Sequence, residues 1–302
     1  MNFMFEVEYS NTTATIKVVG VGGGGINAVN LMISRGLEGV EFIAIDTDAQ
    51  SLSTSQAPRR IRIGEKSFQK ILKEIYDELR GANLVFIVAG MGGKTATSAV
   101  PFIAACARAL DATVISAVSI PFSFEDPSRK VFADMGIENL RCNGNTIILI
   151  PSDELIGEEK ISAEKAFKVA DDFSYKVVQG IAQLITMPGM VNLDFNDIAE
   201  ILDDSSFAFA GIGEACGEDS CVTATQNALN SPLIKSNIQR ANSVFISFIG
   251  GSEDSLTMFE VNEASNIVQD AASPEAEIMW GMSEDESFGD TVRVVIIATR
   301  FN

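Results

Sequence analysis

Apolar runs rich in Val and Ile alternate with segments of helical periodicity along the first half of the chain. The runs typical of strands are ATIKVVG, EFIAID, ANLVFIVAG, TVISAVSI and NTIILIP, and helical segments such as NAVNLMI and PFIAACARAL stand between them. Few polar residues interrupt these runs, as expected for strands buried on both faces of a parallel sheet. The alternation predicts a doubly wound, mostly parallel α/β domain in residues 1–158.

The longest helical pattern of the chain follows this domain. Between Glu159 and Thr186, apolar residues recur at steps of three and four, which predicts a helix about 40 Å long at 1.5 Å per residue. Pro188 and Gly189 end the pattern. Residues 159–187 are therefore expected to form a central helix between two domains.

The remaining residues, 188–302, mix strands and helices less regularly. Helices are predicted near Asp194–Leu202, Val222–Leu229 and Glu260–Ala271, and strands at SVFISFIG, AEIMWG and TVRVVIIATRF. A looser region is expected around Gly211, Gly213 and Gly217. The pattern predicts a smaller α+β second domain with a sheet of its own.

The net negative charge of the chain argues against some classes of binding partner. The 302 residues include 22 Lys and Arg against 41 Asp and Glu, a formal net charge of −19. Such a charge repels nucleic-acid phosphates and anionic lipids. There is also no run of 18 consecutive apolar residues, so we predict no nucleic-acid partner and no direct membrane insertion.

The amino-acid composition also excludes some kinds of catalytic and metal site. The chain has no histidine, which excludes Ser–His and Cys–His nucleophile pairs and imidazole metal sites. The four cysteines show no CxxC spacing and no secretory leader precedes them, so a reducing, cytoplasmic location is expected. Proton chemistry must therefore come from carboxylates, Lys, Cys, Tyr or water.

The segment GVGGGGIN, Gly20 to Asn27, follows a predicted strand and precedes a predicted helix. Glycines let the backbone approach a phosphate closely, and a helix N-terminus adds partial positive charge. Together with Asp46 at the end of the next strand, this spacing also fits a Rossmann-type NAD-dependent dehydrogenase. Besides a phosphate-binding loop and a dinucleotide-binding loop, the segment could also be a tight turn that binds no ligand.

A second glycine-rich turn, Gly90 to Ser98, again lies between a strand and a helix. A dinucleotide fold does not require it. Two such loops at neighbouring strand ends predict a nucleotide whose phosphates are held from both sides. A Walker A loop is excluded because Val88 stands six residues before Lys94, where that motif requires glycine.

Several motifs, taken together, resemble those of one family. They are GVGGGGINAVN, FIAIDTDAQSL, VFIVAGMGG, PFSFE, QGIAQLITMPGMVNLDFNDI and VRVVIIAT, which occur in this order between about Ile16 and Phe301. The chain thereby resembles FtsZ, the prokaryotic tubulin homologue. The resemblance implies a GTP-binding domain, a long central helix and a second domain. It also implies head-to-tail assembly into protofilaments, in cell division or a related cytoskeletal role.

The resemblance further implies cofactors, partners and site residues. The cofactor is GTP or GDP with Mg²⁺, although the sequence shows no dedicated metal cage. The partners are other copies of the chain, with division or membrane-adaptor proteins as candidates. The implied nucleotide-binding residues are Gly22, Gly23, Gly24, Asn27, Asp46, Gly90, Gly92, Gly93, Lys94, Thr95, Ala96, Thr97, Glu125, Arg129, Phe167 and Asp171.

Phe167 and Asp171 are four residues apart and share a helix face. A ring there can pack on a purine while the carboxylate accepts hydrogen bonds from guanine N1 and N2. The alternative for Phe167 is a core aromatic.

The segment NLDFND corresponds to the catalytic loop of the family, which implies catalytic roles for Asn192, Asp194 and Asp197. These residues would act on the nucleotide of the neighbouring subunit, where a carboxylate that orients an attacking water is sufficient. Asp194 and Asp197 also have the spacing of helix-capping residues, which is the alternative role.

The chain departs from the family pattern at several positions. The resemblance identifies Gly90–Ser98 as the signature loop of the family, and Lys94, Ala96 and Ser98 replace glycines in it. Each replacement costs about 1–3 kcal/mol if its position requires φ > 0. Lys94 is expected either to pair with a phosphate or to be a surface lysine. Ile26 replaces a glycine, and Ser152 stands where the family has an asparagine near the base.

The largest departure lies between Gly64 and Ala82, where the family has a long glycine-rich segment that wraps the γ-phosphate. Here the sequence EKSFQKILKEIYDELR predicts a helix almost directly after Gly64. Two hypotheses about the family function follow. The first is a GTPase that hydrolyses GTP between subunits, slowly because of the altered loops. The second is a nucleotide-binding filament scaffold with little or no hydrolysis.

Overall fold

The computed structural model describes residues 14–64, 67–143, 145–157, 160–186, 195–203, 207–251 and 256–301. All of its principal strands belong to one ten-stranded sheet of order β3-β2-β1-β4-β5-β6-β7-β10-β8-β9. The strands of the first half are β1 (Ile16–Val21), β2 (Val40–Asp46), β3 (Arg59–Arg62), β4 (Leu84–Gly90), β5 (Thr113–Ile120) and β6 (Thr146–Pro151). These six strands are all parallel, as predicted.

The strands of the second half are β7 (Phe207–Cys216), β8 (Ala241–Gly250), β9 (Glu277–Glu284) and β10 (Thr291–Phe301). Here β10 pairs antiparallel with both β7 and β8, whereas β9 pairs parallel with β8. The prediction of a separate second sheet is wrong, because β7 joins β6 through the parallel pairs Ile147↔Phe207 and Ile148↔Ala208. Only two residues of β7 make this contact, so the two halves of the sheet are joined by a narrow connection.

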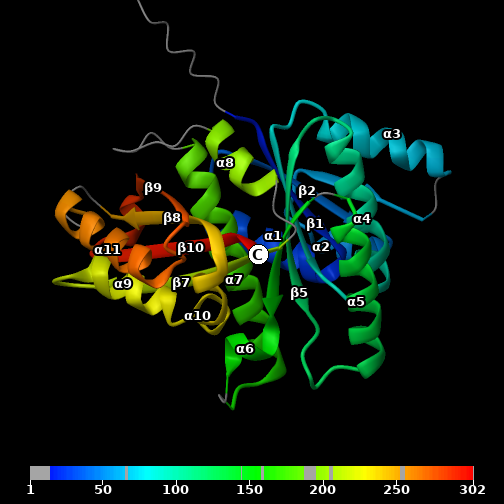
Figure 1. Ribbon diagram of the computed structural model, residues 1–302. Helices are drawn as coiled ribbons and strands as arrows, with labels where there is room; N and C mark the ends of the chain where they lie inside the picture. The colour runs from blue at the N-terminus through cyan, green and yellow to red at the C-terminus, as the bar shows by residue number, and fades with distance from the viewer. Residues whose placement is uncertain are drawn as a thin grey trace, which may run out of the picture.

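Helices cover both faces of the sheet (Figure 1). They are α1 (Gly22–Ser34), α2 (Ala49–Thr54), α3 (Phe68–Leu79), α4 (Lys94–Arg108), α5 (Pro127–Arg141), α6 (Ser152–Ile156), α7 (Ala163–Thr186), α8 (Phe195–Asp203), α9 (Ser220–Leu229), α10 (Pro232–Asn237) and α11 (Met258–Ala271). Two short 3-10 helices, η1 (Ile238–Arg240) and η3 (Glu286–Phe288), complete the described elements.

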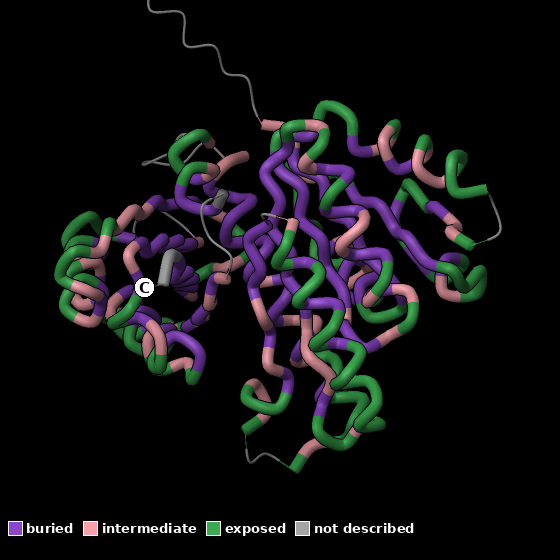
Figure 2. Tube along the Cα trace, turned by 45° about the vertical axis from the view of Figure 1, so that its right-hand side comes forward, coloured by how far each residue is buried: buried purple, intermediate pink, exposed green. Residues whose placement is uncertain are grey.

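Most residues of the strands are buried (Figure 2), and the buried apolar side chains form clusters on the two faces of the sheet. Apolar side chains of α3, α4 and α5 pack on one face of β1–β6, and those of α9 and α11 pack on one face of the second-half strands. A third cluster combines α1, α7 and α8 with both halves of the sheet, from Phe86 on β4 to Val295 on β10. The predicted central helix is thus confirmed, beginning at Ala163 rather than at residue 159, and it holds the two halves together.

The region around Gly211 and Gly213 is strand β7, not the looser segment that we predicted. A Cβ atom at Gly213 would lie 1.9 Å from the carbonyl oxygen of Ala224, and one at Gly211 would lie 2.4 Å from that of Ala228. Both carbonyls belong to α9. The glycines therefore permit close packing of a helix on a regular strand.

Within the described part of the chain, no helix is long and apolar enough to cross a membrane.

Candidate functional site

The carboxyl ends of the parallel strands carry the loops that the sequence singled out. β1 leads directly into α1 at Gly22, and β4 is followed by a turn and then by α4, which begins at Lys94. Ligands of doubly wound sheets bind at this edge. A cavity of about 260 Å³ opens there. Seven of the predicted nucleotide-binding residues line it: Gly24, Asn27, Gly90, Glu125, Arg129, Phe167 and Asp171.

Aromatic rings form one wall of this cavity. Phe122 stacks on Phe124 with a centroid distance of 4.9 Å, and Phe167 packs edge-on against Phe122 at 5.3 Å. Phe167 remains 44% exposed, so the alternative of a core aromatic is wrong. The exposed ring faces offer a surface on which a planar base can stack.

Asp171 lies one helical turn from Phe167 and faces the same cavity. Burial raises the pKa of its carboxyl from 3.8 to about 7. In the described part of the chain, no group donates a hydrogen bond to it. A ligand with two adjacent N–H donors would supply the missing partners and favour the charged form.

Two buried hydroxyls, those of Ser152 and Ser174, line the same cavity as Asp171. The sequence singled out Ser152 only as a departure from the family pattern, and it did not single out Ser174. Ser152 Oγ donates to the carbonyl of Ile120 at 2.6 Å, and Ser174 Oγ donates to that of Ala170 at 2.9 Å. With their hydrogens engaged, both hydroxyls present only acceptor lone pairs to the cavity. This end of the cavity is therefore rich in acceptors and suits a base edge rich in donors.

The signature loop folds without the strain that its substitutions led us to expect. Gly92 has a φ of +89°, and a Cβ there would lie 2.5 Å from the carbonyl of Arg129. Lys94, Ala96 and Ser98, by contrast, lie within α4, and the only described non-glycine residues with positive φ are Asp111 and Asp219. The expected strain is wrong because the helix begins at Lys94 and gives these positions ordinary helical dihedrals.

A hydrogen-bonded cluster lies next to this loop. The Asp46 carboxylate accepts from the Thr47 main-chain N–H at 2.7 Å and from Thr95 Oγ1 at 2.9 Å. The Thr47 and Thr95 hydroxyls are themselves 2.7 Å apart. Gly22 adjoins this cluster, since a Cβ there would lie 3.8 Å from Thr95 Cβ. Both glycine-rich loops and the end of β2 thus meet at one place.

The remaining predicted residues of the first half are close to the same loops. Thr97 Oγ1 accepts from the Gly92 N–H at 3.0 Å, Arg129 pairs with Glu125 at 3.2 Å, and Ala96 is buried. Gly23 has open space in front of it, Gly93 caps the start of α4, and Lys94 is exposed.

Two of the three predicted catalytic residues, Asn192 and Asp194, lie outside the described residues. The third, Asp197, is exposed in the first turn of α8. Figure 1 shows α8 and α6 at opposite ends of α7, and the cavity lies at the α6 end. Asp171 and Thr186 are separated by about 22 Å of helix at 1.5 Å per residue. Asp197 therefore cannot reach the cavity of its own chain.

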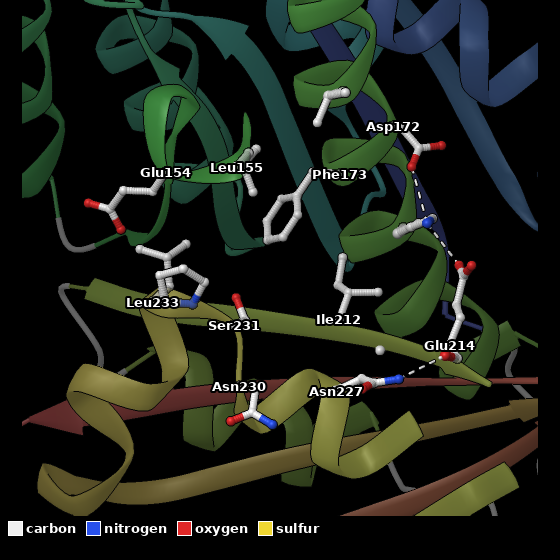
Figure 3. Close-up of a pocket in the computed structure, with 14 residues that line it drawn as sticks. Glu154, Leu155, Asp172, Phe173, Ile212, Glu214, Asn227, Asn230, Ser231 and Leu233 are labelled. Carbon is white, nitrogen blue, oxygen red and sulfur yellow. Dashed lines mark hydrogen bonds and ion pairs between the residues drawn. The ribbon is translucent and has the colours of Figure 1, made fainter. Parts of the chain in front are cut away.

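A second cavity of about 470 Å³ lies between α7 and the second half of the sheet (Figure 3). A chain of alternating charges borders it: Arg35–Asp172 at 2.5 Å, Asp172–Lys176 at 3.2 Å, Lys176–Glu214 at 2.8 Å and Glu214–Arg293 at 2.7 Å. This series of ion pairs runs from Arg35, at the end of α1, through α7 to β7 and β10. It links the two halves of the sheet through α7, the helix that also carries Asp171.

Replacement of Glu214 by glutamine should lower the free energy of unfolding by about 2 kcal/mol, because Arg293 would lose the carboxylate that pairs with it and Lys176 would keep only Asp172. The loss is smaller than the roughly 3–5 kcal/mol for a fully buried pair, since 37% of the Glu214 side chain is exposed. Chemical denaturation of the variant measures it. Glu164→Gln, which removes an exposed pair with Lys168, is the control and should not change the midpoint.

The contribution of Glu214 should also depend on pH. Burial acts to raise its pKa, but the hydrogen bond from Lys176 and the charges of Arg293 and Lys176 hold the pKa below 4.5. A depressed pKa stabilises the folded state above the unfolded pKa, and this contribution is lost as pH falls through the folded value. The difference in stability between Glu214→Gln and the parent chain should therefore shrink in acid. A difference that grows in acid would contradict this account of the network.

Comparisons with known proteins find one family with matches in both halves of the chain. Residues 60–159 match the GTPase domain of the tubulin/FtsZ family, and residues 206–302 match the C-terminal domain of the FtsZ family. The structure is similar to that of an empty FtsZ dimer from M. jannaschii, with a TM-score of 0.89 and 34% identity, covering 96% of this chain and 89% of that one.

Two more distant structures share the fold. A GTPγS-bound protofilament of CetZ2 from Haloferax volcanii has a TM-score of 0.80 and 16% identity, covering 95% of this chain and 93% of that one. CetZ from Methanosaeta thermophila has a TM-score of 0.77 and 17% identity, covering 94% and 86%. At these identities the similarity concerns the fold alone.

Proposed function

Because the chain belongs to the tubulin/FtsZ superfamily, we propose that it binds GTP in the cavity beside Phe167 and Asp171 and assembles head to tail into filaments. The observation that carries this proposal is the acceptor-rich end of the cavity. Asp171, Ser152 and Ser174 all present acceptors there, and guanine offers donors at N1 and at the 2-amino group. Adenine lacks a donor at N1 and matches this edge poorly.

We also propose that GTP is hydrolysed between subunits. The support is the place of Asp197, at the opposite end of α7 from the cavity of its own chain. Head-to-tail stacking would bring this end of one subunit to the cavity of the next. The dimer and the protofilament among the similar structures are consistent with self-association. A cytoskeletal role in the cytoplasm, in cell division or a related process, completes the proposal.

Magnesium would accompany the nucleotide. The oxygen atoms of Asp46, Thr47 and Thr95 are hard ligands of the kind that Mg²⁺ prefers. No group of three or more acidic or cysteine side chains in the described part of the chain is arranged to hold a metal. The phosphates would therefore supply much of the coordination, and the ion would neutralise their charge.

The second candidate function is a filament scaffold with little hydrolysis. The observation that favours it is the start of α3 at Phe68, which leaves only residues 63–67 between β3 and the helix. The family segment that wraps the γ-phosphate is correspondingly short here. Filaments that form equally well with GDP would favour the scaffold over a GTP-switched polymer.

Thermal unfolding with added nucleotide tests the binding proposal. GTP or GDP with Mg²⁺ should raise the melting temperature, since a ligand that binds only the folded state stabilises it. ATP at the same concentration should have much less effect. Protection by NAD without protection by GTP would contradict the proposed guanine-nucleotide site.

Affinity for guanine nucleotides should fall by about tenfold between pH 8 and pH 6, from the pKa of about 7 at Asp171. The charged carboxylate accepts from guanine, so below pH 7 the free protein must first lose a proton before it binds. Titration calorimetry at several pH values measures the change. Asp171→Asn is the control, since it retains the titration of the nucleotide phosphates but should lose the additional slope. An equal slope in both proteins would remove Asp171 from base recognition.

A further inference from the structure

The end of β3 lies beside Asp46 and Thr47, which we propose to be close to the phosphates. Arg62 is the last residue of β3 and pairs in register with Asp46, the last residue of β2. Parallel strands bring their carboxyl ends to one edge of the sheet, which here is the edge that carries both glycine-rich loops. Arg62 is therefore at the same edge as the proposed phosphate site.

Direct contacts connect Arg62 to these loops. Arg62 Nε donates to the carbonyl of Thr47 at 3.4 Å. A Cβ at Gly64 would lie 3.7 Å from Thr47 Cγ2, so residues 62–64 pack on Thr47. The Thr47 hydroxyl reaches Thr95 at 2.7 Å, and Thr95 adjoins Gly22. One continuous series of contacts thus leads from the Arg62 side chain to the loops proposed to hold the phosphates.

The carboxylates at this place favour a cationic side chain as a further partner for a bound phosphate. Asp46 and Asp48 put two carboxyl groups beside the proposed phosphates. A terminal phosphate would add further negative charge.

We propose that Arg62 binds the terminal phosphate of GTP and so distinguishes GTP from GDP in place of the missing glycine-rich segment. This inference rests on the proposed function. A guanidinium has five N–H donors in a planar fork, a geometry that matches phosphate oxygens bidentately. Lys94, which is exposed at the first residue of α4 and precedes Thr95 in the sequence, supplies a second positive charge.

The affinities of GTPγS and GDP, measured by titration calorimetry with Mg²⁺, test this role. Arg62→Gln should weaken GTPγS binding by about tenfold or more, because it removes a charge-assisted contact, and should change GDP binding less than about twofold. Arg62→Lys should give an intermediate loss for GTPγS, since it keeps the charge but not the fork. Arg59→Gln is the matched control on the same strand. Arg59 pairs with Glu78 of α3, so its removal should leave both affinities unchanged.

Each outcome decides between binding and structural roles. Selective loss of GTPγS affinity in Arg62→Gln, with an unchanged melting temperature of the free protein, supports the proposal. An equal loss for GTPγS and GDP would show that Arg62 only supports the loop of Thr47, and unchanged affinities would show that it contacts no phosphate. Either result overturns the inference while the proposed function stands. If the parent chain bound neither nucleotide, the proposed function itself would fail.

Discussion

Replacement of Asp197 by alanine should lower GTP turnover by about 100-fold or more while leaving GTP binding nearly unchanged. A carboxylate that orients or deprotonates an attacking water contributes on the order of 10²–10⁴ in rate. Asp197 lies away from the cavity of its own chain, so its loss does not touch the residues proposed to bind the nucleotide. Phosphate release at saturating GTP and calorimetric binding measure the two effects separately.

A mixing experiment shows whether Asp197 acts on a neighbouring subunit. The Asp197→Ala chain retains its nucleotide site, and the Asp171→Asn chain retains its Asp197. Neither should hydrolyse GTP efficiently alone, but a mixture should recover part of the activity wherever Asp197 of one chain meets the nucleotide of the other. Glu200→Ala, on the same helix, is the control and should keep full turnover. A mixture no more active than its components would contradict action between subunits.

Asp171→Asn should weaken GTP binding by about 100-fold and create binding of xanthosine triphosphate. The amide keeps an acceptor for N1–H but places an NH₂ group where the 2-amino group of guanine needs an acceptor, so one contact is lost and one becomes repulsive. Xanthine carries a carbonyl at that position and accepts from the new amide. Competition binding with GTP, xanthosine triphosphate and ATP measures the change in specificity.

The gain of a new ligand separates base recognition from simple damage to the fold. A variant that no longer binds GTP but binds xanthosine triphosphate is folded and has changed its specificity. Ser174→Ala removes a hydroxyl from the same wall of the cavity. It should weaken GTP binding much less, because that hydroxyl is neutral and already donates to the carbonyl of Ala170 in its own helix. Unchanged GTP affinity in Asp171→Asn would place the base elsewhere.

The parallel part of the fold could be predicted from sequence because its strands are buried on both faces. That burial requires uninterrupted Val and Ile runs, which stand out between helical segments. The junction of β6 and β7 could not be predicted, since only two residue pairs make it and about 60 positions separate the partners. The looser region predicted at Gly211 and Gly213 was wrong because a glycine that permits close helix packing looks the same in sequence as one that breaks a strand.

The candidate site shows the same division. Phe167 and Asp171 were expected at the site because the resemblance to FtsZ implies them, and helical spacing puts the two residues on one face. Ser152 and Ser174 gained their role as acceptors only through the carbonyls that their hydroxyl groups contact, and no sequence pattern shows such contacts. The strain expected at Lys94 did not arise because the start of α4 depends on the packing of the whole loop. The roles of the site residues remain predictions.

The central claim is that the active site is completed by a second copy of the chain. Phosphate release from GTP with Mg²⁺, measured against protein concentration from well below to well above the micromolar range, tests it most directly. The account predicts negligible turnover per chain below a threshold concentration and a steep rise above it, as filaments form. Turnover per chain that stays constant at all concentrations would mean that each monomer hydrolyses GTP alone, and the account would be wrong.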